Sequence, residues 1–279
     1  MTAPESNKDG EVPRSPGRLL SEPFALTGRK MINWIDNLGA ATIFLSRAFL
    51  KIFRPKQLFK IIEQLYYIGS GSVLIIMLVG LFTGMVLGLQ SYHALVKFGS
   101  EGALGTLVSL SLIRELGPVL TAIMITARAG SAITAEIGSQ RISEQIDALK
   151  TMRIDPLRFL ISPRIAASII SFPLLTALFD VIGIIGGYIS GVVLLGVNAG
   201  TYLHRVQSSV EMKDITDGFI KAMVFAVIVT TVCCYQGYFT HMRTDSHGAR
   251  AIGRATTTAV VLSCVLILVA DYIVTSLLI

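Results

Sequence analysis

Residues 104–127 read LGTLVSLSLIRELGPVLTAIMITA, an apolar run in which only Arg114 and Glu115 carry charge. A segment of about 20 apolar residues is long enough to cross the hydrocarbon core of a bilayer as a helix. A charged side chain in that core costs about 2.5–3.5 kcal/mol even on permissive scales, so two adjacent charges indicate a functional site. The stretch therefore predicts a membrane-spanning helix that contains a polar site.

The whole chain has the composition of an integral membrane protein. Its 279 residues are 52% hydrophobic and only 15% charged, and the mean hydropathy is +0.67. These values predict one all-α polytopic membrane domain. The net charge of +6 does not indicate nucleic-acid binding, because the basic residues flank apolar spans and form no stripe interleaved with aromatic residues.

Five apolar stretches are long enough to cross a membrane. They are residues 68–89, 104–127, 165–195, 219–238 and 255–278. Of the 24 Lys and Arg residues, 10 lie before the first stretch, 6 lie between the second and third, and 3 lie between the fourth and fifth. Positive residues gather in cytoplasmic loops, so we expect these three regions and the N-terminus in the cytosol, with the C-terminus on the opposite side.

Two segments are expected before the five-span domain of residues 65–279. Residues 1–23 combine prolines with Ser, Gly and charged residues and have no apolar core for a signal peptide, which predicts a disordered cytosolic tail. Within residues 24–64, apolar residues from Met31 to Ile52 recur at helical spacing beside basic residues. This pattern favours an amphipathic helix on the membrane surface, with a helix packed against the protein as the alternative.

Glycines recur at four-residue intervals in two spans. The first span has Gly80, Gly84 and Gly88, and the third has Gly183, Gly187 and Gly191. Small residues at this spacing allow helix backbones to approach closely. We therefore expect tight helix packing along both faces.

The other charged residues within or at the spans are Asp180, Lys221 and Asp271. Neighbouring residues on a helix point about 100° apart, so Arg114 and Glu115 need partners from other spans, and these three residues are the candidates. One interpretation is a set of ion pairs that only fix the helix register. The other is a polar patch that lines a cavity for an amphiphile with an anionic headgroup.

The loop of residues 128–164 has an amphipathic centre. Ile142, Ile146 and Leu149 fall on one helical face, and charged residues surround them. The pattern predicts a short cytosolic helix, which either docks a partner or lies on the membrane surface.

Several motifs together closely resemble the MlaE/YrbE permease family. They are SLIRELGPVL (111–120), ARAGSAITAEIG (127–138), DPLR (155–158), ISPR (161–164), GMVLGLQ (84–90), SFPLLT (171–176) and IGRATT (252–257). The likeness covers about residues 60–279. The tail before Phe24 and the residue Asp180 stay outside it.

This resemblance implies a homodimeric permease with an exporter-like ABC fold in the bacterial inner membrane. Such a permease moves phospholipid between that membrane and a periplasmic MCE-domain protein, and so maintains outer-membrane lipid asymmetry. Cytosolic ABC ATPase subunits are the implied source of energy, and a small cytosolic STAS-type subunit is a candidate further partner. The C-terminus is then periplasmic.

The resemblance also implies roles for particular residues. The lipid cavity would include Arg114, Glu115, Lys221, Asp271, Leu87 and Leu116. The helix that couples to the ATPase would include Glu136, Arg141, Ile142, Glu144, Ile146 and Leu149.

The sequence lacks the motifs of an enzyme. It has no GxxxxGK phosphate loop, so we expect ATP and magnesium to bind the partner ATPase only. The four histidines show no metal-ligand spacing, and the three cysteines lie in apolar segments, which predicts no metal, cofactor or catalytic residue in this chain.

Two other functions fit some of these features. A proton-coupled carrier of an amphiphile would use Glu115, Asp180 and Asp271 as a proton relay. A membrane scaffold without transport would use the buried charges for packing alone.

Overall fold

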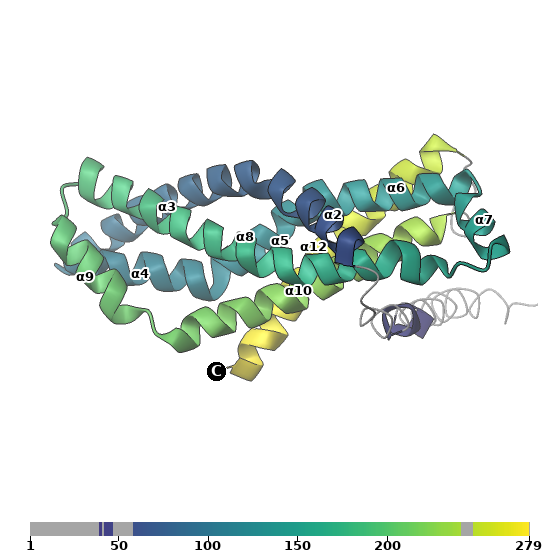
Figure 1. Ribbon diagram of the computed structural model, residues 1–279. Helices are drawn as coiled ribbons and strands as arrows, with labels where there is room; N and C mark the ends of the chain where they lie inside the picture. Colours follow the sequence, from purple (N-terminus) through teal and green to yellow (C-terminus); the bar gives the residue numbers. More distant parts are fainter. Residues whose placement is uncertain (1–38, 41, 47–57, 241–247, 279) are drawn as a thin grey trace, which may run out of the picture. The chain divides into compact units, whose positions relative to one another are not determined.

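The computed structural model describes residues 39–40, 42–46, 58–240 and 248–278. These residues form helices and no strand (Figure 1). The α-helices are α2 (Leu58–Ile68), α3 (Val73–Val96), α4 (Leu104–Ser111), α5 (Gly117–Ile125), α6 (Ser131–Ile142), α7 (Gln145–Thr151), α8 (Ser162–Tyr188), α9 (Ala199–Ser209), α10 (Met212–Tyr238) and α12 (Ala249–Leu278). The π-helical segments are Leu112–Leu116, Thr126–Gly130, Leu157–Ile161 and Ile189–Leu194. The all-α prediction is confirmed.

Five helical stretches are long and apolar enough to cross a membrane. They are Leu58–Val96, Glu101–Ile142, Leu157–Leu194, Met212–Tyr238 and Ala249–Leu278. Four of them contain a predicted apolar stretch completely, and the third, which ends at Leu194, covers all but the last residue of the predicted stretch 165–195. The number and order of the predicted stretches are therefore confirmed. The helices extend beyond the apolar residues, however, and the fourth begins at Met212 rather than at residue 219.

The glycine series bring α3 and α8 together along their lengths. A Cβ atom added to Gly84 would collide with the carbonyl oxygen of Gly183, and one added to Gly80 would lie 3.0 Å from the carbonyl oxygen of Phe179. The two backbones are therefore in direct contact, as the four-residue glycine spacing predicts.

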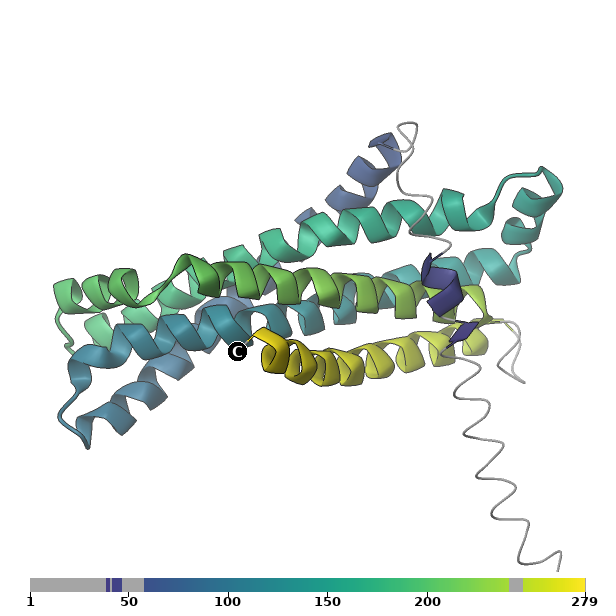
Figure 2. The same cartoon turned by 90° about the horizontal axis from the view of Figure 1, so that it is seen from below.

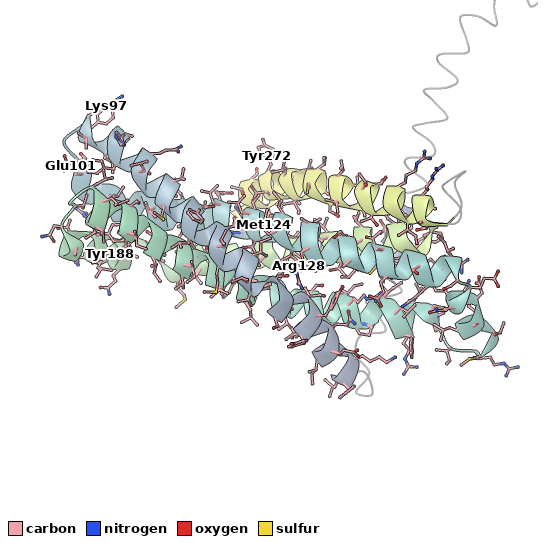
Figure 3. All side chains as sticks on the ribbon, turned by 90° about the horizontal axis from the view of Figure 1, so that it is seen from above. Lys97, Glu101, Met124, Arg128, Tyr188 and Tyr272 are labelled. Carbon is pink, nitrogen blue, oxygen red and sulfur yellow. The ribbon has the colours of Figure 1, made fainter. Side chains whose placement is uncertain are left out.

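The other long helices complete the bundle. α10 packs against α6, α8 and α12, and Figure 2 shows α12 running beside α10. The outward faces carry exposed apolar side chains, among them Phe82 on α3 and Tyr272 on α12, which points away from the bundle in Figure 3. Such faces suit contact with lipid tails.

The two ends of the bundle hold different connections. α9 lies at one end, together with Lys97 and Glu101, and the turn between α6 and α7 lies at the other end (Figures 1 and 3). The loops after the second and third spans are thus on opposite sides, as alternating spans require.

The amphipathic helix predicted around residues 136–149 is not one helix. α6 ends at Ile142 and α7 begins at Gln145. Between them Glu144 has φ = 58°, and a residue in this left-handed region interrupts an α-helix. Ile142, which lies before this turn, therefore does not share a continuous helical face with Ile146 and Leu149, which lie after it.

Most of the N-terminal predictions concern residues outside the described part of the chain. The predicted tail 1–23 lies wholly outside it, and the helix predicted from Met31 to Ile52 is described only at residues 39–40 and 42–46, which are helical. The chain divides into Met1–Ile43 and Phe44–Ile279. The division into tail, interfacial helix and five-span domain stays a prediction.

Candidate functional site

The π-helical segment Leu112–Leu116 carries the two charges of the second span. Pro118 follows it near the start of α5 and has no N–H group. The carbonyl group of Arg114, which would pair with residue 118 in an α-helix, is therefore left without its helical donor. Inside a bilayer such a carbonyl needs a donor from elsewhere in the protein.

Lys221 on α10 supplies that donor. Its Nζ atom lies 2.8 Å from the carbonyl oxygen of Arg114, 2.8 Å from Glu115 Oε2 and 3.3 Å from Asp271 Oδ1. The Lys221 side chain is only 3% exposed, so its three N–H groups face three acceptors and little water. Lys221 thus links the second, fourth and fifth spans.

Gly218 allows α10 to pack closely against the π-helical segment of the second span. A Cβ atom added to Gly218 would lie 2.8 Å from the carbonyl oxygen of Ile113. Because glycine has no Cβ, the backbone of α10 can pack against the widened π turn. This contact places Lys221, about one helical turn further on, over the Arg114 carbonyl.

Arg114 pairs with Asp214, a residue that the sequence analysis did not identify. The Nε and Nη2 atoms of Arg114 lie 2.8 Å and 2.7 Å from Asp214 Oδ1. The other oxygen of Asp214 accepts the N–H of Glu211 at 3.1 Å, and the Glu211 side chain accepts the N–H of Asp214 in a reciprocal capping box. The N-terminal end of α10 therefore holds the carboxylate of Asp214 in place, and Arg114 binds to this carboxylate. The spacing Glu211-x-x-Asp214 before an apolar run was the available signal.

The structure brings together four of the five charged residues singled out within the spans. Arg114, Glu115, Lys221 and Asp271 form one cluster, which Thr275 joins with a hydrogen bond of 3.4 Å to Glu115 Oε1. Asp180 is not paired with this cluster. It lies on α8 against Gly117, and its Oδ1 atom has no hydrogen-bond partner among the described residues.

A polar cavity of about 310 Å³ opens over this cluster. Its lining comes from the π segment, the start of α10 and the end of α12. The lining residues are Arg114, Glu115, Glu211, Lys213, Asp214, Asp217, Lys221, Thr275 and Leu278. The side chain of Arg114 is 56% exposed, which makes its guanidinium group accessible to a ligand.

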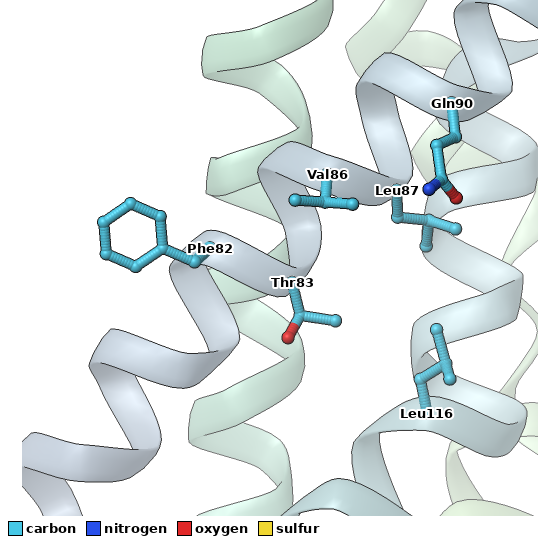
Figure 4. Close-up of a pocket in the computed structure, with 6 residues that line it drawn as sticks. All are labelled: Phe82, Thr83, Val86, Leu87, Gln90 and Leu116. Atoms are coloured by element: carbon cyan, nitrogen blue, oxygen red, sulfur yellow. The ribbon is translucent and has the colours of Figure 1, made fainter.

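An apolar cavity of about 370 Å³ borders the same π segment (Figure 4). Its lining residues are Phe82, Thr83, Val86, Leu87, Gln90 and Leu116. Leu87 and Leu116, which the resemblance placed beside lipid tails, therefore line one cavity. Leu116 directly follows Glu115, so a charged surface and an apolar surface lie within one helical turn of each other.

Glu136 lies on α6, and its side chain is 45% exposed. Its Oε1 atom is 2.6 Å from Nη2 of Arg164 at the start of α8, and the Arg164 side chain is only 3% exposed. Arg164 Nε also donates to Gln64 Oε1 of α2 at 3.4 Å. These interactions connect α2, α6 and α8 and leave Glu136 away from the α6–α7 turn.

An ion-pair network crosses the α6–α7 turn. Asp147 Oδ1 lies 2.7 Å from Arg141 Nη1 and 3.0 Å from Lys150 Nζ. Hydrogen bonds from Lys150 and from Arg141 hold the pKa of the Asp147 carboxyl below its ordinary value of 3.8. The network holds α7 against the end of α6.

The remaining residues of the predicted coupling helix differ in how far they are buried at this turn. Ile146 is fully buried and Leu149 is half-buried, whereas Ile142 and Glu144 are exposed. A partner protein can therefore reach Ile142 and Glu144 directly. Ile146 is enclosed by other residues of this chain.

Within the described residues, no group of three or more His, Cys, Asp or Glu side chains is placed to hold a metal ion. Cys233 and Cys234 are buried, and Cys264 is partly exposed. The expectation that this chain carries no metal or cofactor stays a prediction.

Comparisons with known proteins agree with the motifs. The family model described as Permease MlaE matches residues 61–277. The chain is 44% identical over 251 residues to the intermembrane phospholipid transport system permease protein MlaE of Haemophilus influenzae, covering 89% of this chain and 94% of that protein. It is 42% identical over 251 residues to a probable ABC transporter permease protein of Rickettsia bellii, covering 90% and 95% respectively.

A plant protein is related more distantly. Over 215 residues the chain is 32% identical to the chloroplastic protein TRIGALACTOSYLDIACYLGLYCEROL 1 of Arabidopsis thaliana, covering 77% of this chain and 60% of that protein. The helices and the relatives together describe a multi-pass inner-membrane transport subunit. With a family model that matches most of its length, the chain belongs to the MlaE permease family.

Proposed function

We propose that this protein is the permease subunit of an ATP-driven ABC transporter that moves phospholipid between the inner membrane and a periplasmic MCE-domain protein. In this role it maintains the lipid asymmetry of the outer membrane. The observation that carries the proposal is the pair of cavities, one charged and one apolar, on either side of the segment Leu112–Leu116. A phospholipid has the same two kinds of surface within one molecule.

In the proposed site, the residues of the charged cluster have different roles. Arg114 holds the lipid phosphate, because its guanidinium group is exposed and retains free N–H donors beyond those bound to Asp214. Lys221, Glu115 and Asp271 hold three spans together, since Lys221 is buried and its donors are already used. Leu87 and Leu116 contact the acyl chains.

The proposed assembly is a homodimer that binds ABC ATPase subunits at the α6–α7 turn. Glu144 and Ile142 contact the ATPase, and the buried Ile146, together with Glu136 and Arg141, passes its movement to the bundle. ATP and magnesium bind the ATPase and not this chain. The N-terminus is cytosolic and the C-terminus periplasmic, and a small STAS-type subunit is a candidate further partner.

Lipid transfer by the reconstituted complex tests the cavity. Arg114→Ala should reduce phospholipid transfer strongly while the complex still assembles. Arg205→Ala, which removes an exposed cation from α9, is the matched control and should transfer lipid normally. Full transfer by the Arg114 variant would refute the assignment of the cavity.

Purification from native membranes tests the coupling turn. Mass spectrometry of the gently isolated protein should identify a stoichiometric ABC ATPase, and Glu144→Lys should lose it. Glu101→Lys, at the opposite end of the bundle, should retain it. An ATPase that remains with the Glu144 variant places docking elsewhere, and the absence of any ATPase from the wild type contradicts the ABC mechanism.

One observation favours a second function, proton-coupled transport. Asp180 is 9% exposed and its Oδ1 atom has no hydrogen-bond partner among the described residues, which is unusual for a carboxylate that stays charged inside a protein. Transport that stops when the proton gradient is collapsed, while ATP remains available, would favour this alternative.

A further inference from the structure

The polar cavity contains more carboxylates than cations. Its cations are Arg114, Lys213 and Lys221, and its carboxylates are Glu115, Glu211, Asp214 and Asp217. Three positive charges against four negative charges leave an excess of one negative charge. A headgroup that carries only a negative charge therefore meets a lining that partly repels it.

Most of these charges already have partners within the protein. Lys221 binds Glu115 and Asp271, and Arg114 binds Asp214 through one edge of its guanidinium group. Asp217 has no hydrogen bond or ion pair in the described part of the chain, and the Glu211 side chain accepts only a backbone N–H at the helix end. The groups left for a ligand are the free edge of Arg114, Lys213 and these two carboxylates.

The free groups are arranged for a ligand with two opposite charges. Asp214, Asp217 and Lys221 recur at intervals of three and four residues on α10, so they share one face, and adjacent members are roughly 5–6 Å apart. Asp217 therefore lies about one helical turn from the carboxylate that holds Arg114. A two-carbon linker between a phosphate and an ammonium group spans a similar distance.

We propose that this cavity selects zwitterionic phospholipids that carry a primary ammonium group, such as phosphatidylethanolamine. The phosphate binds Arg114, and the ammonium group donates hydrogen bonds to Asp217 and Glu211. No aromatic residue is among those that line the cavity, so the site lacks the ring faces that bind quaternary ammonium groups. This inference rests on the proposed function and adds the class of headgroup to it.

The test is lipid competition on the purified full-length protein. The protein is incubated in mixed micelles with equimolar phosphatidylethanolamine, phosphatidylglycerol and phosphatidylcholine of identical acyl chains, and bound lipids are counted by native mass spectrometry. We expect a preference for phosphatidylethanolamine over each of the other lipids of about fivefold to tenfold, the size of one charge-assisted hydrogen bond to a partly exposed group. Asp217→Asn should bring the ratio towards one, and Glu101→Gln, outside the cavity, should leave it unchanged.

Each other outcome has a distinct meaning. Equal binding of all three lipids, lost in Arg114→Ala, would overturn the headgroup inference and leave the proposed function intact. Equal binding of phosphatidylethanolamine and phosphatidylcholine would overturn the role of the N–H donors. The absence of any bound phospholipid would overturn both the proposed function and the inference. Glu211→Gln, which keeps an acceptor for the helix cap, provides a second variant and should lower the ratio as Asp217→Asn does.

Discussion

Replacing Lys221 with methionine removes a side chain that forms ion pairs with both Glu115 and Asp271. The substitution keeps an unbranched side chain, one atom shorter, but deletes a hydrogen bond of 2.8 Å to the carbonyl group of Arg114 and ion pairs of 2.8 Å with Glu115 and 3.3 Å with Asp271. The carbonyl group of Arg114 cannot gain the usual α-helical donor in exchange, because the residue four positions later is Pro118, which has no N–H group. Two carboxylates are then left close together without their shared cation.

The energetic cost follows from burial. Removing one partner of a buried ion pair costs about 3–5 kcal/mol, and a buried carbonyl without a donor costs about 1–3 kcal/mol. The side chains of Glu115 and Asp271 are 44% and 20% exposed, so water recovers part of the loss. We therefore expect a net decrease of about 3 kcal/mol in the free energy of unfolding, which is about a 100-fold change in the equilibrium constant.

The buried cysteines provide the assay. Cys233 and Cys234 are 0% exposed, so a thiol-reactive fluorophore labels them only when the bundle opens. In a Cys264→Ala background, Lys221→Met should lower the temperature at which labelling begins. Lys213→Met, which removes an exposed cation from the same helix, serves as the control and should behave like the parent protein.

A triple variant distinguishes the effect of leaving carboxylates without a cation from the effect of lost packing. Adding Glu115→Gln and Asp271→Asn to Lys221→Met leaves no unpaired charge, and so part of the stability should return. If Lys221→Met and Lys213→Met unfold at the same temperature, Lys221 does not hold the spans together and the reasoning fails.

Three further predictions concern the helix contacts and the α6–α7 turn. Gly84→Ala should destabilise the protein in the same labelling assay, because its Cβ would collide with Gly183. Gly253→Ala, whose Cβ meets nothing within 4 Å, should stabilise it by about 0.5–1 kcal/mol, and a stable Gly84 variant would contradict the close contact. Glu144→Gly should raise stability by about 1 kcal/mol, since glycine adopts a positive φ without strain, and an unchanged midpoint would argue against strain at this turn. The pKa of Asp147 is lowered in the folded protein, so its ion pairs contribute above the unfolded pKa and are lost as the pH falls through the folded value. Amide exchange of residues 145–151, corrected for intrinsic rates, should stay slow from pH 7 to 5 and rise below about pH 4, whereas release at pH 6 would contradict the pairing.

The spans themselves were predictable because hydrocarbon imposes a minimum apolar length on each helix. Their ends were not, because a helix can continue past the apolar run once its polar residues find partners. The first turns of α10 show the difference: Asp214 and Asp217 read as loop residues, yet a capping box places them in the helix. The glycine contacts were predictable, since close backbone approach requires absent side chains.

The sequence predicted four members of the charged site, but it missed Asp214, and it did not predict which residues pair. The cost of placing charge in hydrocarbon identified Arg114, Glu115, Lys221 and Asp271 without any structure. Which of them meet depends on how each helix is rotated about its axis, and periodicity within one helix does not determine this. Asp214, the actual partner of Arg114, was missed for another reason, because it lies before the predicted apolar stretch 219–238.

The direct backbone contact between α3 and α8 determines which parts of the bundle can rearrange. Where Gly84 meets Gly183, no side chains separate the backbones, so the two helices can neither slide past each other nor rotate without collision. We therefore expect α3 and α8 to move together. Leu87 belongs to that pair of helices and Leu116 to the π turn, so the width of the apolar cavity changes only when the pair and the π turn move relative to each other.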